Sequence, residues 1–97
     1  MIRSFGDKRT EDLFHGTSSS HARRIATNIR ATAVRKLDLI NAAVVLEDLR
    51  SPPGIRLEAL SGDLHGMHSI RINDQWRIVI RWSESGAEDV QIIDYHR

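Results

Sequence analysis

The sequence predicts an α+β domain in which helices pack against a mainly antiparallel β-sheet. In the first half, apolar residues recur at spacings of three and four between Ala22 and Ala43, which is the period of an amphipathic helix. In the second half, apolar and polar residues alternate, which is the period of a β-strand. The segment SPPG at 51–54 separates the halves, because proline lacks an N–H and disfavours helix in the preceding residue. Helices followed by strands are typical of α+β folds.

Length and composition limit what this chain can be. Its 97 residues suffice for one domain, taken as residues 1–97, with a single core. The longest apolar run, AAVVL at 42–46, is too short to span a membrane, so we expect no membrane partner. The chain has no cysteine, hence no disulfide and no thiolate metal site, and we expect it in the cytoplasm.

The charges are distributed unevenly along the chain. Residues 1–50 hold nine Lys/Arg and six Asp/Glu, a net +3, whereas residues 51–97 hold five and seven, a net −2. With a total of only +1, the protein is not a uniform polycation that binds nucleic acid by charge alone. A polyanion would have to be held by a local cluster of cations.

The N-terminal third predicts a strand, a helix and a loop. MIRSF at 1–5 is consistent with a short strand, and residues 7–16 form one helical stretch. Asp7 is a suitable N-cap for that helix, and Gly16 is a suitable stop. The polar segment TSSSH at 17–21 follows as a loop, in which a serine can cap the next element.

A long amphipathic helix is expected from Ala22 to about Ala43. Its apolar stripe consists of Ile25, Ile29, Ala33, Leu37, Ile40 and Val44. Five basic residues lie mostly off that stripe, namely Arg23, Arg24, Arg30, Arg35 and Lys36. We interpret them as a solvated outer face rather than an RNA-binding helix. The segment VVLEDLR at 44–50 either continues the helix or forms a second short one.

The final third predicts four strands. They are IRLEAL at 55–60, MHSIRIN at 67–73, WRIVIRW at 76–82 and VQIIDYH at 90–96, with the turn SGDLHG at 61–66. Trp76 and Trp82 share a face with Ile78 and Ile80, so we expect them in the core or as cover for the sheet.

The register of the two clearest strands follows from which side chains must be buried. A three-residue loop, 73–75, pairs Ile72 with Trp76, whereas a two-residue loop would mix apolar and polar residues on both faces. The same register sets Arg71 directly opposite Arg77, with Arg81 further along that face. Like charges in this position destabilise a sheet. The face is therefore either solvated, with arginine stems lying over it, or a shallow basic groove for a phosphate backbone, and we favour the groove.

The last strand ends in an acid, a phenol and an imidazole. Asp94 and His96 share one face if the strand stays regular, and Tyr95 points away, whereas a curled end would bring all three to one rim. The segment SESGAED at 83–89 has no obvious loop length, so the pairing of this strand with 76–82 stays open. His65 and His68 form a His-x-x-His pair, but no third ligand lies at a suitable spacing, and we expect no metal site.

The sequence resembles the HigB toxins of bacterial type II toxin–antitoxin systems, in the RelE/ParE superfamily and particularly its GraT-like branch. The similarity covers nearly the whole chain through MIRSF, DLRSPPG, RLEALSGD, HSIRINDQWRI and the final DYH. It implies an N-terminal strand and helices packed on a curved, mainly antiparallel sheet. It also implies a cytoplasmic toxin without cofactor that enters the ribosomal A site and cuts the mRNA there, inhibiting translation and growth.

The resemblance implies partners as well. These are a HigA-type helix-turn-helix antitoxin, the 70S ribosome with its mRNA, and operator DNA only through the antitoxin complex.

The resemblance also implies roles for individual residues in a metal-independent attack by the RNA 2′-hydroxyl. Arg77, in the QWRI motif, would stabilise the phosphorane, with Asp94 or Glu58 as base and His96 as acid. Tyr95 would stack on or orient a base of the RNA. Further RNA or ribosome contacts are expected from Arg71, Arg81 and Ser61. Two positions depart from the family pattern, because Glu58 replaces a histidine and Ser61 replaces a lysine or arginine, and we expect weaker catalysis from both.

Two other functions compete with the nuclease. One is a ParE-like inhibitor of DNA gyrase that performs no chemistry, and the other is a catalytically weak protein that only binds an antitoxin. The terminal DYH and the arginine of QWRI favour the nuclease, and gyrase inhibitors of this superfamily do not depend on a terminal acid–histidine set.

Overall fold

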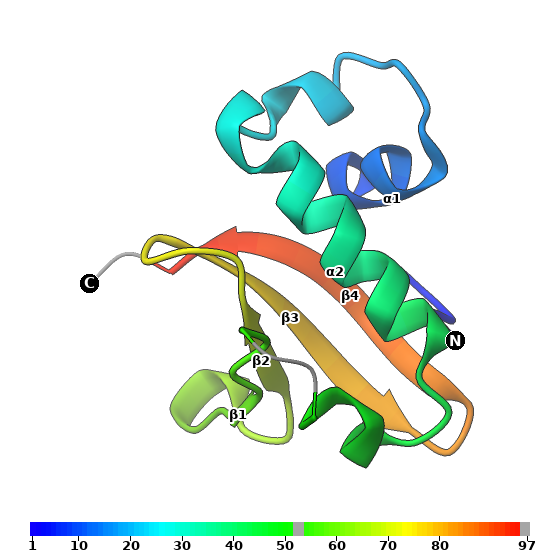
Figure 1. Ribbon diagram of the computed structural model, residues 1–97, viewed down its shortest axis with the longest axis vertical. Coiled ribbons are helices and arrows are strands. Elements are labelled where there is room, and N and C mark those ends of the chain that lie inside the picture. The colour runs from blue at the N-terminus through cyan, green and yellow to red at the C-terminus, as the bar shows by residue number, and fades with distance from the viewer. Residues whose placement is uncertain (52–53, 96–97) are drawn as a thin grey trace.

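The computed structural model describes residues 1–51 and 54–95 (Figure 1). The two α-helices are α1 (Lys8–His15) and α2 (Arg30–Ala42). Short 3₁₀ turns are η1 (Ala22–Arg24), η2 (Thr27–Ile29), η3 (Leu46–Leu49) and η4 (Gly62–Leu64). The strands are β1 (Glu58–Ala59), β2 (His68–Arg71), β3 (Trp76–Ser83) and β4 (Gly86–Asp94). Within the described residues no helix combines the length and apolar character needed to cross a membrane.

The strands form one antiparallel sheet in the order β1-β2-β3-β4, and α2 lies across β3 and β4 (Figure 1). The core lies between them. Leu37 and Ile40 of α2 and Ile70, Ile78 and Ile92 of the sheet are at most 1% exposed. This confirms the predicted α+β architecture.

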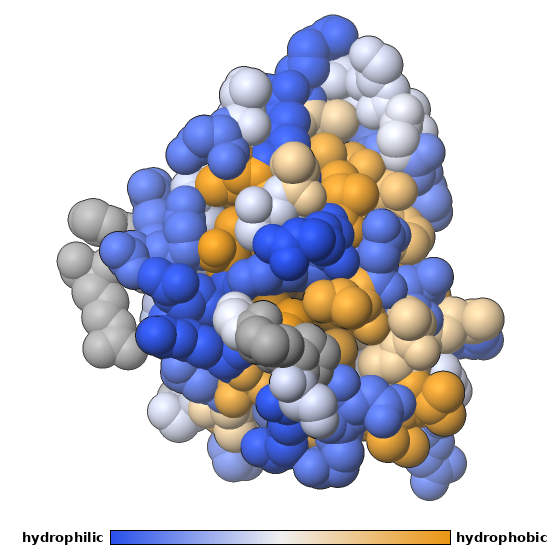
Figure 2. Space-filling view, viewed as in Figure 1, coloured by the Kyte–Doolittle hydropathy of each residue, from blue (hydrophilic) through white to orange (hydrophobic). Residues whose placement is uncertain are grey.

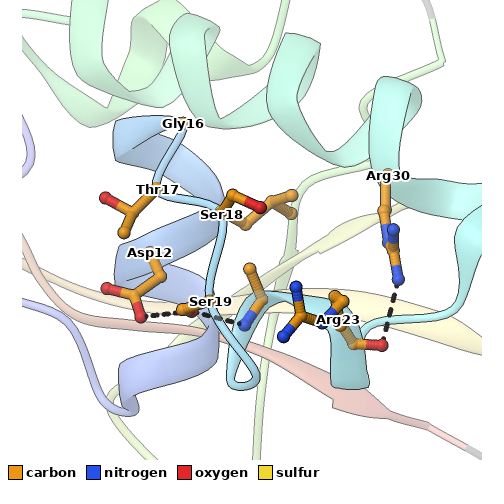
Figure 3. Close-up of a pocket in the computed structure, with 9 residues that line it drawn as sticks. Asp12, Gly16, Thr17, Ser18, Ser19, Arg23 and Arg30 are labelled. Carbon is orange, nitrogen blue, oxygen red and sulfur yellow. Dashed lines mark hydrogen bonds between the residues drawn. The ribbon is translucent and has the colours of Figure 1, made fainter.

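The first helix is bounded by the predicted caps. The Asp7 carboxylate accepts a hydrogen bond from Thr10 N at 2.8 Å, and Gly16 adopts the left-handed conformation with a φ of 71°. The loop after α1 is held by side chains (Figure 3): Ser19 Oγ donates to Asp12 Oδ2 at 2.7 Å and accepts from Ala22 N at 3.1 Å. That hydrogen bond from Ser19, together with Lys8, lowers the pKa of Asp12. The cap expected from a serine is therefore Ser19.

The long helix predicted from Ala22 to about Ala43 is confirmed over 30–42 as α2 and is wrong before it, because the separate 3₁₀ turns η1 and η2 replace its first part. Ile25 has an extended ψ of 131° and breaks the helical path. Arg30 donates from Nε to Ile25 O at 2.8 Å and from Nη2 to Arg23 O at 3.0 Å (Figure 3), which satisfies carbonyls at the break. Ile25 and Ile29 are nevertheless buried, because successive 3₁₀ turns keep a spacing close to that of a helix.

Two side chains near α2 also differ from the prediction. Val44, expected on the apolar stripe, is 83% exposed because α2 ends before it. Figure 2 shows hydrophobic surface at the lower right of the molecule, where α2 ends in Figure 1. Lys36, expected on the solvated face, is only 6% exposed. Residues 46–49 form the separate turn η3, which agrees with the second of the two alternatives for this segment.

The N-terminal strand is reduced to two isolated bridges beside β4, Ile2 to Ala87 and Phe5 to Val90, both parallel. The cause is a β-bulge in β4, where two residues oppose one residue of β3 and Asp89 has a positive φ of 53°. Ser4 Oγ accepts a hydrogen bond from Asp89 N at 2.8 Å, so a side chain replaces part of the regular ladder.

The register predicted for β2 and β3 is confirmed, with Ile70 opposite Ile78 and Arg71 opposite Arg77. The first predicted strand, 55–60, shortens to β1, because Arg56 has a left-handed φ of 48°. The last strand is predicted at 90–96, but the observed strand β4 begins earlier, at Gly86. At Gly86 the φ is 132° and an added Cβ would collide with Met1 O, so this turn requires glycine.

Candidate functional site

The sheet face opposite α2 carries the arginines predicted from the register. Arg71 forms an ion pair with Asp74, Arg77 with Glu58 at 3.5 Å, and Arg81 with Asp89 at 3.4 Å. The face therefore presents paired arginines, which differs from the basic groove that we favoured from the sequence. Neighbouring like charges are tolerated there because an acid from a turn, an edge strand or the bulge lies beside each arginine.

Four residues form what we call the Arg77 cluster: Arg77, its neighbours Glu58 and Tyr95, and Ser69 on the same face of β2. The Arg77 side chain is only 15% exposed, while that of Glu58 is 53% exposed. The Tyr95 ring lies against the guanidinium, with 5.1 Å from Arg77 Cζ to the ring centroid. A carboxylate and an aromatic face thus hold the guanidinium in one orientation.

Two buried polar atoms of this cluster lack a hydrogen-bond partner within the described residues. They are Arg77 Nε and Ser69 Oγ. Ser69 is fully buried and stands opposite Glu58 on β1 and Val79 on β3. Buried donors without acceptors are costly, at about 1–3 kcal/mol each. Both atoms are shielded from solvent, so this cost falls on the stability of the sheet face.

The end of β4 is anchored to the loop before β3. Gln75 O accepts a hydrogen bond from Tyr95 N at 2.6 Å, and Gln75 Nε2 donates to Asp94 Oδ2 at 3.0 Å. These bonds explain how polar residues so close to the chain end are held in place. His96, the expected acid, lies outside the described residues.

The pairing of the last strand, which the sequence left open, does not set Asp94 opposite Arg77. In the observed register Asp94 stands opposite Trp76, and Arg77 stands opposite Ile93. The bulge at Asp89 is the reason. If the pairing of β3 and β4 continued regularly from the tight turn at 84–85, with no extra residue in β4, Arg77 would stand opposite Ile92. Arg77 would then share a face of the sheet with Asp94. With one extra residue in β4, Tyr95 comes to Arg77 and Asp94 turns toward Gln75.

The remaining predicted positions are not part of the Arg77 cluster. Ser61 is exposed at the start of η4, and no described contact links it to Arg77. His68 is half-buried at the edge of the core, as expected. Among the described residues, no three His, Asp or Glu side chains gather closely enough to hold a metal ion.

Lys36 supports the arginine face from beneath and was missed from the sequence. Its Nζ donates to Arg71 O at 2.5 Å and to Gly54 O at 3.1 Å. Burial lowers the pKa of Lys36, and the positive charges of Arg35 and Arg71 lower it further. A signal was present, because Lys36 is three residues after Ala33 and four before Ile40, in line with the apolar stripe.

Ser69 and Gln75 were also missed as parts of the site. Ser69 lies two residues before Arg71 on the same strand, and Gln75 directly precedes the QWRI tryptophan. Period two alone places Ser69 on the arginine face, but only the partner strands reveal that it is buried there.

The comparisons with known proteins agree with this fold. The family model described as RelE-like toxin of type II toxin-antitoxin system HigB matches residues 3–96. Toxin HigB-1 of Vibrio cholerae serotype O1 is 40% identical over 87 residues, which cover 90% of this chain and 90% of that protein. An uncharacterised protein of Haemophilus influenzae is 30% identical over 79 residues, covering 81% of this chain and 77% of that protein.

Among solved structures, a chain of the YoeB–YefM complex from Staphylococcus aureus is similar with a TM-score of 0.61. The match covers 100% of this chain and 99% of that chain at 15% identity, so it bears on the fold alone. The family match over nearly all residues and the likeness to the Vibrio cholerae toxin together show that this chain belongs to the RelE-like HigB toxins of type II toxin–antitoxin systems.

Proposed function

We propose that this toxin cleaves mRNA on the ribosome and that the Arg77 cluster binds the phosphate at which the RNA is cut. The observation that carries this is the guanidinium of Arg77, whose N–H donors are held between the Glu58 carboxylate and the Tyr95 ring. Such donors suit a phosphate that gains charge in the transition state. Preorganised donors of this kind contribute roughly 10²–10³-fold to rate.

In this mechanism the 2′-hydroxyl attacks the adjacent phosphorus. Glu58 takes the proton of the 2′-hydroxyl, the 2′ oxygen bonds to phosphorus, and the bond from phosphorus to the 5′ oxygen breaks. A proton from His96 neutralises the leaving oxygen, and the products are a 2′,3′-cyclic phosphate and a 5′-hydroxyl. The assignment of His96 rests on the resemblance alone.

Glu58 suits the base role better than Asp94. Its carboxylate is more than half exposed and already lies next to Arg77, so substrate and water can reach it. The Asp94 carboxylate accepts from Gln75 on the other side of the strand end. In this proposal Asp94 helps anchor the chain end, and Tyr95 orients Arg77 while presenting its ring to the RNA.

The partners follow from the family. Its members are toxins of type II toxin–antitoxin systems, and the similar Staphylococcus aureus chain is part of a complex. We therefore propose that a HigA-type helix-turn-helix antitoxin binds and neutralises this protein, and that the complex reaches operator DNA through the antitoxin. The 70S ribosome with its mRNA is the target.

One experiment tests the reaction. The protein and its Arg77→Ala variant are induced in separate cultures, and transcript 5′ ends are mapped. We expect cuts in phase with codons on translated messages for the unaltered protein and none for the variant. A melting curve of the variant serves as the folding control.

The other functions give different results. Double-strand DNA breaks without phased cuts would refute the nuclease and support a gyrase inhibitor. If cells grow normally with the unaltered protein and with the Arg77→Ala variant, and the protein still binds an antitoxin, the result would support a protein that only binds its antitoxin.

A further inference from the structure

A second group of basic side chains lies beside α1 and η1, outside the Arg77 cluster. It lines a hollow of about 310 Å³ formed by Asp7, Lys8, Arg9, His21 and Arg24. We call this hollow the α1–η1 pocket. Its lining contains three formally charged cations and a histidine but one acid, so the chemistry of the pocket suits an anion.

Of the three cations that line the pocket, Arg24 has no acid partner among the described residues. Lys8 is paired with Glu11 and Asp12, and Arg9 with Asp7 at 3.1 Å. Arg24 is exposed, and it takes part in no ion pair among the described residues, nor does the adjacent exposed Arg23. On the sheet face, by contrast, Arg71, Arg77 and Arg81 each have an acid partner.

One cation of the pocket is already held in position. The Arg9 side chain is about 31% exposed, and its Nη2 donates to Ile92 O at 2.8 Å. The same backbone unit is fixed by Thr10 Oγ1, which accepts from Ile92 N at 3.0 Å. A guanidinium fixed in this way loses little rotamer freedom when it binds a ligand.

The pocket and the Arg77 cluster lie at the same end of the sheet. Arg9 binds the backbone of β4 at Ile92, and the next residue, Ile93, stands opposite Arg77 on β3. Neighbouring strands are only about 4.8 Å apart. A chain with several phosphates, bound at Arg77, can therefore continue over β4 to the α1–η1 pocket.

We propose that the α1–η1 pocket is a phosphate-binding site for an RNA backbone, with Arg24 and Arg9 as the binding cations. This proposal rests on the proposed function. The pocket would supply the electrostatic attraction for RNA that the paired arginines of the sheet face do not. Guanidinium groups bind phosphate through two parallel hydrogen bonds, and such contacts make affinity depend on salt. The phosphate belongs either to the mRNA beside the cut or to ribosomal RNA.

The test uses the full chain with Arg77→Ala as the background, so that RNA is not consumed during binding measurements. Arg24→Glu is compared with Arg35→Glu, which makes the same charge change at an exposed arginine of α2 outside the pocket. Affinity is measured over a range of salt concentrations for a short single-stranded RNA and for 70S ribosomes without mRNA. Melting curves check that both variants fold.

We expect Arg24→Glu to weaken binding several-fold more than Arg35→Glu, and to reduce the salt slope by about 0.7 for each lost contact with a single strand. A loss with the short RNA identifies mRNA as the source of the phosphate. A loss with empty ribosomes alone identifies ribosomal RNA. Equal effects of the two substitutions on both probes would overturn the proposal.

Failure of this proposal is separate from failure of the nuclease. The binding measurements need no cleavage, whereas the nuclease depends on phased cuts by the unaltered protein. If the unaltered protein makes phased cuts but Arg24→Glu and Arg35→Glu bind RNA equally, the pocket proposal would be refuted and the nuclease proposal supported.

Discussion

The sheet face around Arg77 and the α1–η1 pocket both carry basic side chains, but they use them differently. On the sheet face each arginine lies beside an acid, and Arg77 is mostly buried between a carboxylate and a ring. In the pocket Arg24 is exposed and has no acid partner in the described part of the chain. The first arrangement fixes the orientation of the Arg77 guanidinium, and the second leaves the positive charge of Arg24 available to a ligand.

This difference suggests that reaction and attraction are separated in the molecule. Paired charges have little long-range field, whereas uncompensated cations attract a polyanion over distances set by the salt concentration. A total charge of only +1 agrees with a protein that meets RNA through one local patch. The separation can be tested by changing each region alone.

The largest effect is expected from Glu58→Gln. Removing the proposed base should lower cleavage by roughly 10²–10⁴-fold. Binding of RNA should stay equal or strengthen, because Arg77 loses its negative partner. Single-turnover cleavage on programmed ribosomes and RNA affinity are measured on the same preparation. Weaker binding with unchanged cleavage would show that Glu58 only holds Arg77, and that the two regions are not separated as described.

A smaller effect is expected from Lys36→Met, which removes the support beneath Arg71. Gly54 O and Arg71 O lose their donor, and the loss of a hydrogen bond costs about 0.5–1.5 kcal/mol of unfolding free energy. Denaturant unfolding measures this loss, and Arg35→Met, at the exposed neighbour on the same helix, is the matched control.

The Lys36→Met variant should cleave RNA more slowly. The dependence of its RNA affinity on salt concentration should be unchanged, because this substitution does not alter the α1–η1 pocket. Increased stability would instead mean that desolvation of the Lys36 charge outweighs its two hydrogen bonds.

The smallest effect is expected from Asp89→Asn, which removes the partner of Arg81 without straining the bulge, since asparagine tolerates a positive φ. An exposed ion pair contributes about 0.2–1 kcal/mol, so stability should change little. RNA affinity at low salt should rise, because Arg81 becomes an uncompensated cation. Unchanged affinity over the whole salt range would show that this part of the sheet face does not meet RNA.

The sequence alone determined much of the architecture. The cap at Asp7, the stop at Gly16 and the register of β2 and β3 follow from local rules about hydrogen bonding and side-chain alternation. The facing pair Arg71 and Arg77 was therefore predictable from side-chain alternation and one loop length. Each of these features depends on residues that are close along the chain or on a short loop.

The tertiary structure decided what surrounds those residues. The bulge at Asp89 adds one residue to β4, which reverses the alternation and exchanges Asp94 for Tyr95 beside Arg77. Arg30 supplies hydrogen bonds at the break before α2, and Lys36 is buried because two carbonyls from distant segments accept its protons. A local period specifies which way a side chain points, but a one-residue irregularity in the partner strand determines what it meets.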